Sequence, residues 1–92
     1  MTAQELAREY GVSVRFVNLG DWGVHELRSE YNPLPPEILV HERLAPQFVA
    51  HAIGHELYHH REAIGEVPVL STRAQREAAA DAYARELATG LR

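Results

Sequence analysis

Four histidines lie within ten residues of one another in the segment FVAHAIGHELYHH, residues 48–60. His51, His55 and His59 are four residues apart, and this spacing places side chains on one face of an α-helix. Two imidazoles on adjacent turns can bind one zinc ion at about 2.0–2.1 Å. The pattern predicts a metal site that uses either His51 with His55 or His55 with His59. His60 lies about 100° around the helix and is left out.

A second group of chemically suitable residues lies in REAAADAYAREL, residues 76–87. Catalytic zinc sites take three protein ligands and leave one position open. Glu77 and Asp81 are four residues apart with three alanines between them, so this helix can pack closely on the histidine helix. We expect Glu77 to be the third ligand and Asp81 to accept the free ring N–H of a ligating histidine. The alternative is that both are surface residues of an amphipathic helix.

Three short strands are expected before the histidine segment. Residues 12–19 alternate and are rich in β-branched side chains. Residues 24–31 give a second strand, predicted to be antiparallel to the first. Residues 32–36, NPLPP, are expected to form a stiff loop outside any central ladder. Residues 37–42 form the third strand, whose edge could pair with an extended peptide.

Three helices complete the predicted fold. Capping boxes at residues 2–5 and 72–75 indicate helices at about 3–10 and 73–89. A proline suited to a first helical turn opens the helix over 46–61. The class is therefore α+β, in the order α-β-β-β-α-α, and we expect a single domain over the 92 residues.

The composition narrows the classes of function. The net charge of −4 argues against direct nucleic-acid binding. The absence of cysteine excludes disulfides, thiolate zinc sites and a cysteine nucleophile, and it fits a reducing cytoplasm. No signal peptide is recognised, and no apolar run approaches the ~18 residues of a membrane span. We therefore expect a cytoplasmic protein without membrane contact.

Residues 37–90 resemble the ImmA/IrrE metallopeptidase family, which is similar to the gluzincin zinc proteases. The residues that match the family's metal-binding helix are Phe48, Ala50, His51, Gly54, His55 and His59. Those that match its later helix are Glu77, Ala80, Asp81, Tyr83, Ala84 and Leu87. The resemblance implies a minimal zincin-like fold, an endopeptidase activity, and zinc ligands at His51, His55 and Glu77. It also implies a protein or peptide substrate, such as a helix-turn-helix transcriptional repressor.

Position 52 departs from the family pattern. The family has a glutamate there, which serves as general base and acid, whereas this chain has Ala52. In this register the domain would bind zinc but would be nearly inactive. An engineered Glu→Ala change would account for the alanine, and so would a natural pseudoenzyme.

A literal HExxH motif begins one turn later, with His55 and His59 as ligands and Glu56 as the catalytic residue. Gly54 occupies the family's glycine position, and Tyr58 is bulky for a close-packed place. The apolar residues also fit the family alignment without a gap. These observations favour the His51 register, in which Glu56 is expected to be exposed and His59 to lie at the rim.

Two other classes of function fit the sequence. One is a non-catalytic zinc-binding adaptor that holds a partner protein, which would bind zinc tightly and show no hydrolysis even after Ala52→Glu. The other is a small metal-free module whose histidines are surface residues.

Overall fold

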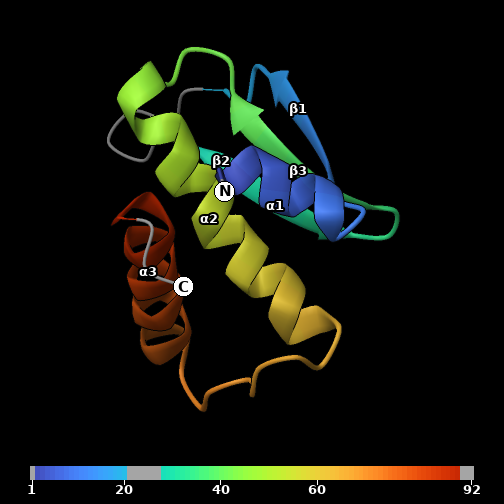
Figure 1. The fold of residues 1–92 in the computed structure, drawn as a ribbon, viewed down its shortest axis with the longest axis vertical. Coiled ribbons are helices and arrows are strands. Elements are labelled where there is room, and N and C mark those ends of the chain that lie inside the picture. Colours follow the sequence, from blue (N-terminus) through green and yellow to red (C-terminus); the bar gives the residue numbers. More distant parts are fainter. Residues whose placement is uncertain (1, 21–27, 90–92) are drawn as a thin grey trace.

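A computed structural model describes residues 2–20 and 28–89 of the chain. These residues form three helices and a three-stranded mixed sheet, so the predicted α+β class is confirmed (Figure 1). The elements are α1 (Ala3–Glu9), β1 (Ser13–Val17), β2 (Ser29–Pro33), β3 (Pro36–His41), α2 (Pro46–Ala63) and α3 (Arg73–Thr89). Their order is the predicted one. The first four positions of the strand expected at 24–31 lie outside the described residues.

Both predicted capping boxes are present. The Thr2 hydroxyl accepts a hydrogen bond from the Glu5 amide at 3.1 Å, and the Glu5 carboxylate accepts from the Thr2 amide at 2.7 Å. Thr72 and Gln75 exchange the same pair of bonds at 3.1 and 3.2 Å. These side chains satisfy backbone N–H groups that the first helical turn leaves without partners, and so fix where α1 and α3 begin.

The sheet has the order β1-β3-β2, with β1 parallel and β2 antiparallel to β3. The predicted pairing of the second strand with the first is therefore wrong. Only Leu34 and Pro35 separate β2 from β3, and so short a connection makes these two strands a hairpin. The expectation that residues 32–36 lie outside a central ladder is wrong for three of them: Asn32 and Pro33 belong to β2, Pro36 begins the central strand β3, and Pro33 pairs with Pro36.

The third strand is also not the edge that the sequence predicted. β3 pairs along both sides and is the central strand of the sheet. Among the described residues β2 pairs with β3 alone, so its other side is an edge. Any peptide that adds to this sheet near α2 would therefore pair with β2 rather than with β3.

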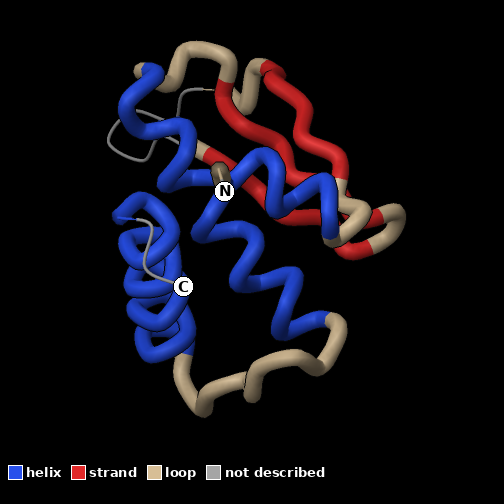
Figure 2. Tube along the Cα trace, viewed as in Figure 1, coloured by secondary structure: helices blue, strands red, loops and turns tan. Residues whose placement is uncertain are grey.

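Two helices cover one face of the sheet and the third packs on the second of them. α1 and α2 contact the strands and each other, whereas α3 lies along α2 (Figures 1 and 2). The core lies between the sheet and its covering helices. Its fully buried members include Ala7, Ile38, Val40, Ile53 and Leu57. This core fixes α2, and with it the histidine face, relative to the sheet.

The contact between α2 and α3 depends on a glycine. A Cβ atom at Gly54 would lie 3.1 Å from the Ala84 Cα and 3.3 Å from a Leu87 methyl carbon. Glycine and alanine thus let the two backbones approach closely, as the alanine-rich sequence predicted. This approach brings the acidic residues of α3 against the histidines of α2.

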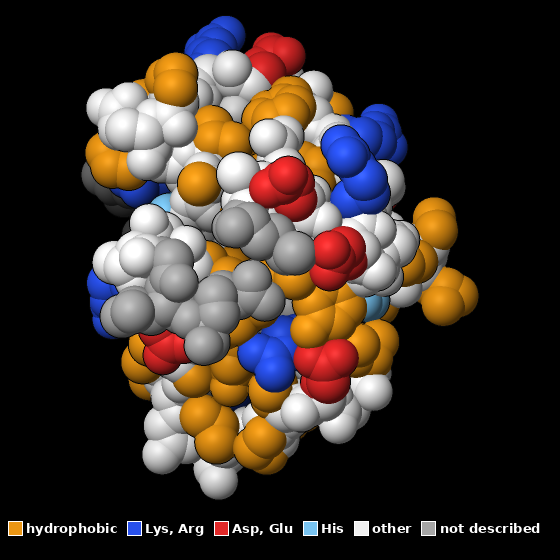
Figure 3. Space-filling view, in the orientation of Figure 1, with side chains coloured by type: hydrophobic (Ala, Val, Ile, Leu, Met, Phe, Trp, Pro, Cys, Tyr) orange, Lys and Arg blue, Asp and Glu red, His pale blue; other side chains and the backbone are white. Residues whose placement is uncertain are grey.

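The surface is mixed in character. In Figure 3 apolar side chains protrude at the β2–β3 turn, where Leu34 is 87% exposed. Within residues 2–20 and 28–89, no helix combines the length and the apolar character needed to cross a membrane.

Candidate metal centre

His55, His59 and Glu77 form a group that could hold a metal ion. The His55 and His59 Nε2 atoms lie 3.3 Å apart. One Glu77 carboxylate oxygen lies 3.2 Å from His55 Nε2, and the other lies 2.9 Å from His59 Nε2. Ligand atoms bound tetrahedrally at zinc distances are about 3.3–3.4 Å apart. The three side chains therefore already have nearly the spacing that such an ion requires.

The other ring nitrogen of each histidine faces a carboxylate. His55 Nδ1 lies 2.7 Å from Asp81 Oδ1, and His59 Nδ1 lies 2.8 Å from Glu62 Oε1. Ionised carboxylates only accept hydrogen bonds, so both Nδ1 atoms carry protons and donate. Each Nε2 atom is then left with a lone pair when its ring is neutral. Two lone pairs and the Glu77 carboxylate thus face one another, an arrangement that a cation stabilises.

The charges around His55 also raise its affinity for a proton. Burial disfavours the imidazolium form. The hydrogen bond to Asp81 and the charges of Glu56 and Glu77 outweigh burial, and the pKa of His55 is raised above its ordinary value. A proton and a metal ion therefore compete for the same ring nitrogen.

Glu62 hydrogen-bonds to His59 and is itself bound by an arginine of α3. Its side chain is 3% exposed and accepts two hydrogen bonds from the Arg76 guanidinium, at 3.0 and 3.2 Å. Burial opposes ionisation, but the bonds from Arg76 and His59 prevail and the pKa of Glu62 is lowered. Neither Glu62 nor Arg76 is among the site residues that the sequence predicts. The available signal was the i, i+3 spacing of His59 and Glu62, which places an acid beside a potential ligand.

Glu56 lies on the side of α2 that faces β2. The expectation that it is exposed is wrong, because only 7% of the residue is accessible. The Ser29 hydroxyl donates to Glu56 Oε2 at 2.6 Å, which orients the carboxyl group. Burial raises the pKa of Glu56, and the Ser29 bond and the neighbouring histidines offset this only in part. Glu56 is thus a buried carboxyl group with increased basicity.

His51 and Ala52 lie farther toward the start of α2. His51 is not a member of the three-residue group found among the described residues. Its Nε2 atom instead lies 3.3 Å from Asp81 Oδ1, the oxygen that His55 also contacts. Ala52 is 7% exposed. Of the three ligands that the family resemblance implied, the structure brings His55 and Glu77 together, with His59 rather than His51 beside them.

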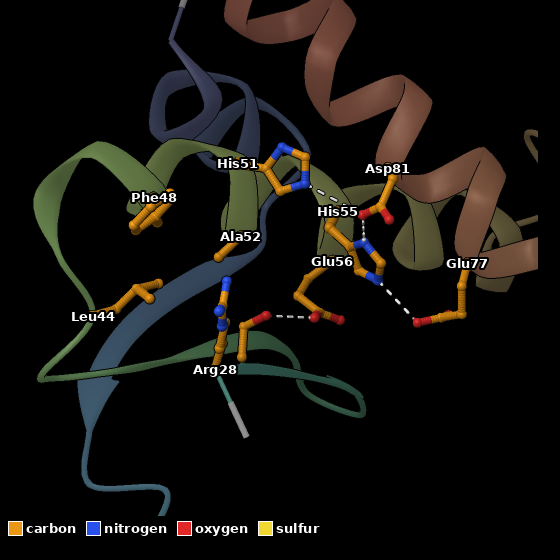
Figure 4. Close-up of a pocket in the computed structure, with 10 residues that line it drawn as sticks. Arg28, Leu44, Phe48, His51, Ala52, His55, Glu56, Glu77 and Asp81 are labelled. Atoms are coloured by element: carbon orange, nitrogen blue, oxygen red, sulfur yellow. Dashed lines mark hydrogen bonds and ion pairs between the residues drawn. The ribbon is translucent and has the colours of Figure 1, made fainter. Parts of the chain in front are cut away.

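A cavity of about 380 Å³ opens over this part of α2 (Figure 4). Its lining includes His51, Ala52, His55, Glu56, Glu77 and Asp81. Glu77 is 44% exposed at its side chain, so the possible metal position is accessible to solvent. An accessible position with three protein ligands is typical of catalytic rather than structural zinc sites.

Comparison with known proteins found no significant match to any protein family, curated protein or solved structure. The resemblance to the ImmA/IrrE family therefore rests on the two helical patterns alone.

Proposed function

We propose that this protein is a zinc-dependent peptidase whose ligands are His55, His59 and Glu77 and whose proton-transfer residue is Glu56. The observation that supports this most directly is the convergence of the two Nε2 atoms and the Glu77 carboxylate within 3.3 Å of one another. Two imidazoles, one carboxylate and an accessible fourth position are the ligand set of peptide-hydrolysing zinc sites. The arrangement of α2, α3 and the mixed sheet is consistent with a minimal zincin-like fold.

Zinc bound in such a site lowers the pKa of a water molecule and polarises the carbonyl group to be attacked. Glu56 follows the first ligand directly and lines the same cavity. Its carboxylate accepts a proton from the attacking water and then donates it to the leaving amine. Burial makes this carboxylate more basic, and the bond from Ser29 keeps it oriented. Asp81 and Glu62 keep the two ligating rings in the tautomer that leaves Nε2 free.

These ligands belong to the literal HExxH motif at residues 55–59, the alternative register in the sequence. In this register Ala52 does not replace a catalytic glutamate, so neither an engineered change nor a pseudoenzyme is needed to explain it. The substrate is an extended peptide that pairs with the edge of β2, since Ser29 on β2 lines the cavity. By the family resemblance, the natural substrate is a helix-turn-helix repressor.

Zinc content and casein hydrolysis of four variants test this proposal. His59→Ala should lose zinc, whereas His51→Ala, the matched control one turn away from the ligands, should keep about one ion per chain. Glu56→Gln should keep zinc and lose about 10²–10⁴-fold in turnover. Ala52→Glu should bring no gain in activity.

The opposite results identify the competing hypotheses. If zinc is lost in His51→Ala but kept in His59→Ala, the ligands are those of the His51 register. In that register Ala52→Glu should create activity. Stoichiometric zinc without hydrolysis in the parent would favour the adaptor. A parent protein that takes up no zinc would leave only the metal-free module.

A further inference from the structure

The cavity extends beyond the metal-binding residues into a part of different chemistry. Leu44, Phe48 and Ala52 form apolar walls there, and Arg28 contributes a cation (Figure 4). In the close-up the Arg28 side chain points toward Ala52, on the opposite side of Glu56 from Glu77. A peptide with its scissile bond at the metal position would therefore place a neighbouring residue against this part of the cavity.

Two contacts position Arg28. Its carbonyl oxygen accepts a hydrogen bond from the His41 amide at 2.8 Å, which anchors the backbone beside the end of β3. Its guanidinium carbon lies 5.8 Å from the centre of the Phe48 ring, within the range of a cation–π contact. These contacts place the guanidinium at the apolar wall, and neither of them uses its N–H donors.

The carboxylates of the cavity already have partners. Glu56 accepts from Ser29, Asp81 from His55, and Glu77 lies against the ligating histidines. Arg28 makes no ion pair with any acidic side chain in the described ranges 2–20 and 28–89. A guanidinium presents paired N–H donors that match the two oxygens of a carboxylate, and this bidentate geometry adds specificity to the contact. The chemistry that complements this part of the cavity is therefore a carboxylate on a short apolar stem.

We infer that the site selects peptides with a carboxylate-bearing residue next to the scissile bond, bound by Arg28 while its methylene groups contact Leu44 and Phe48. This inference rests on the proposed peptidase function. The carboxylate can belong to an acidic side chain or to the free end of the substrate chain. A cavity of about 380 Å³ is near the lower end of ligand pockets, so it accommodates one or two residues and specificity centres on that neighbour.

A peptide library containing free and amidated C-termini, digested by the zinc-loaded protein, tests the inference. Mass spectrometry should show one of two patterns. Either Glu or Asp is enriched beside the cleaved bond, or peptides are cleaved close to a free C-terminus but not close to an amidated one. The ratio of kcat/KM for matched Glu and Gln peptides should be about 2- to 5-fold, because Arg28 is exposed and solvent weakens an ion pair there. Arg28→Gln should remove most of this ratio, and Arg28→Glu should reverse the preference toward Lys. Arg8→Glu, an exposed position on α1, is the matched control and should keep the ratio.

Three outcomes would overturn the inference. These are a parent without preference for carboxylates, an unchanged preference in Arg28→Glu, and an equal loss on all peptides in both Arg28 variants. The last would assign Arg28 to the reaction itself rather than to selection.

Peptide binding separates this inference from the proposed function. The same Glu and Gln peptides are titrated against zinc-loaded Glu56→Gln protein, with and without Arg28→Gln, by fluorescence anisotropy. Tighter binding of the Glu peptide that is lost in Arg28→Gln would support the carboxylate site. If the parent protein then cleaves no peptide, only the peptidase function is rejected. Equal binding of both peptides would reject the carboxylate site whatever the activity.

Discussion

The Nδ1 atom of His55 lies 2.7 Å from Oδ1 of Asp81. This short bond joins α2 to α3 and fixes the side of the His55 ring that carries the proton. The opposite nitrogen is then directed at His59 and Glu77. A carboxylate behind a ligating imidazole both orients the ring and makes it a stronger donor to a metal. Asp81 thus acts on the metal position through His55.

Asp81→Asn should weaken zinc binding by about 10- to 100-fold, because the amide can accept the same hydrogen bond but lacks the negative charge. A competition titration against a chromophoric chelator measures the zinc Kd. Glu86→Gln, an exposed position on the same helix, is the control and should leave the Kd unchanged. Equal Kd values in the two variants would show that Asp81 has no part in holding zinc.

Glu62→Gln should reduce both zinc affinity and stability. His59 loses the charge behind its ring, and Arg76 loses an ionised acceptor at a buried position. Loss of such charge-assisted hydrogen bonds costs about 1–3 kcal/mol of unfolding free energy. Urea unfolding of the zinc-free protein measures the stability, and the chelator titration measures the zinc Kd. A variant that loses stability but keeps the parental Kd would limit Glu62 to a structural role.

The sequence predicted those parts of the fold whose signals are local. The capping boxes at Thr2 and Thr72 depend on side chains three residues apart, and both are present. The strand order depends on contacts between distant residues. The prediction paired the first two strands because they are neighbours in the sequence, but the two-residue connection at Leu34 and Pro35 makes β2 and β3 partners.

The site shows the same division between local and distant information. Helical spacing placed the histidines on one face, but it could not show which pair faces Glu77, since that depends on how α3 lies along α2. In the sequence, Gly54 favours the His51 register. In the structure it permits the close approach of Ala84, a role that either register allows. The size of Tyr58 also favours the His51 register, yet in the structure its ring lies beside that of Tyr83, with centroids 5.9 Å apart.

Gly54→Val should destabilise the fold and weaken zinc binding together. Its side chain would meet the Ala84 backbone, and overpacking of this kind costs about 1–3 kcal/mol. Any shift of α3 that relieves the clash moves Glu77 away from the histidines. Thermal unfolding and zinc titration measure the two effects. Ala50→Val, an exposed position inside the same helix, controls for the helix propensity of valine and should retain the parental Kd. Normal zinc affinity in Gly54→Val would show that the position of α3 does not set the site.

The pH dependence of stability should reveal the buried His60. This residue is 5% exposed, and its Nδ1 atom lies 2.8 Å from the Tyr31 hydroxyl. Burial lowers the pKa of His60 below its ordinary value of 6.5. Between the two pKa values, His60 is protonated in the unfolded chain but neutral in the folded chain. This residue therefore lowers the unfolding free energy as the pH falls from 6.5 toward the pKa of the folded state.

Urea unfolding of the zinc-free protein at pH 7.5, 6.5 and 5.5 tests this. The parent should lose more unfolding free energy over this range than His60→Phe, which removes the titrating group but keeps a ring of similar size. His55, with its raised pKa, contributes in the opposite direction, but equally in both proteins. Tyr31→Phe removes the hydroxyl that contacts His60 Nδ1, so it should lower the stability at every pH and also change the slope, since a hydrogen bond to the ring shifts the His60 pKa. Parallel curves for the parent and His60→Phe would show that His60 is protonated as readily in the folded chain as in the unfolded one.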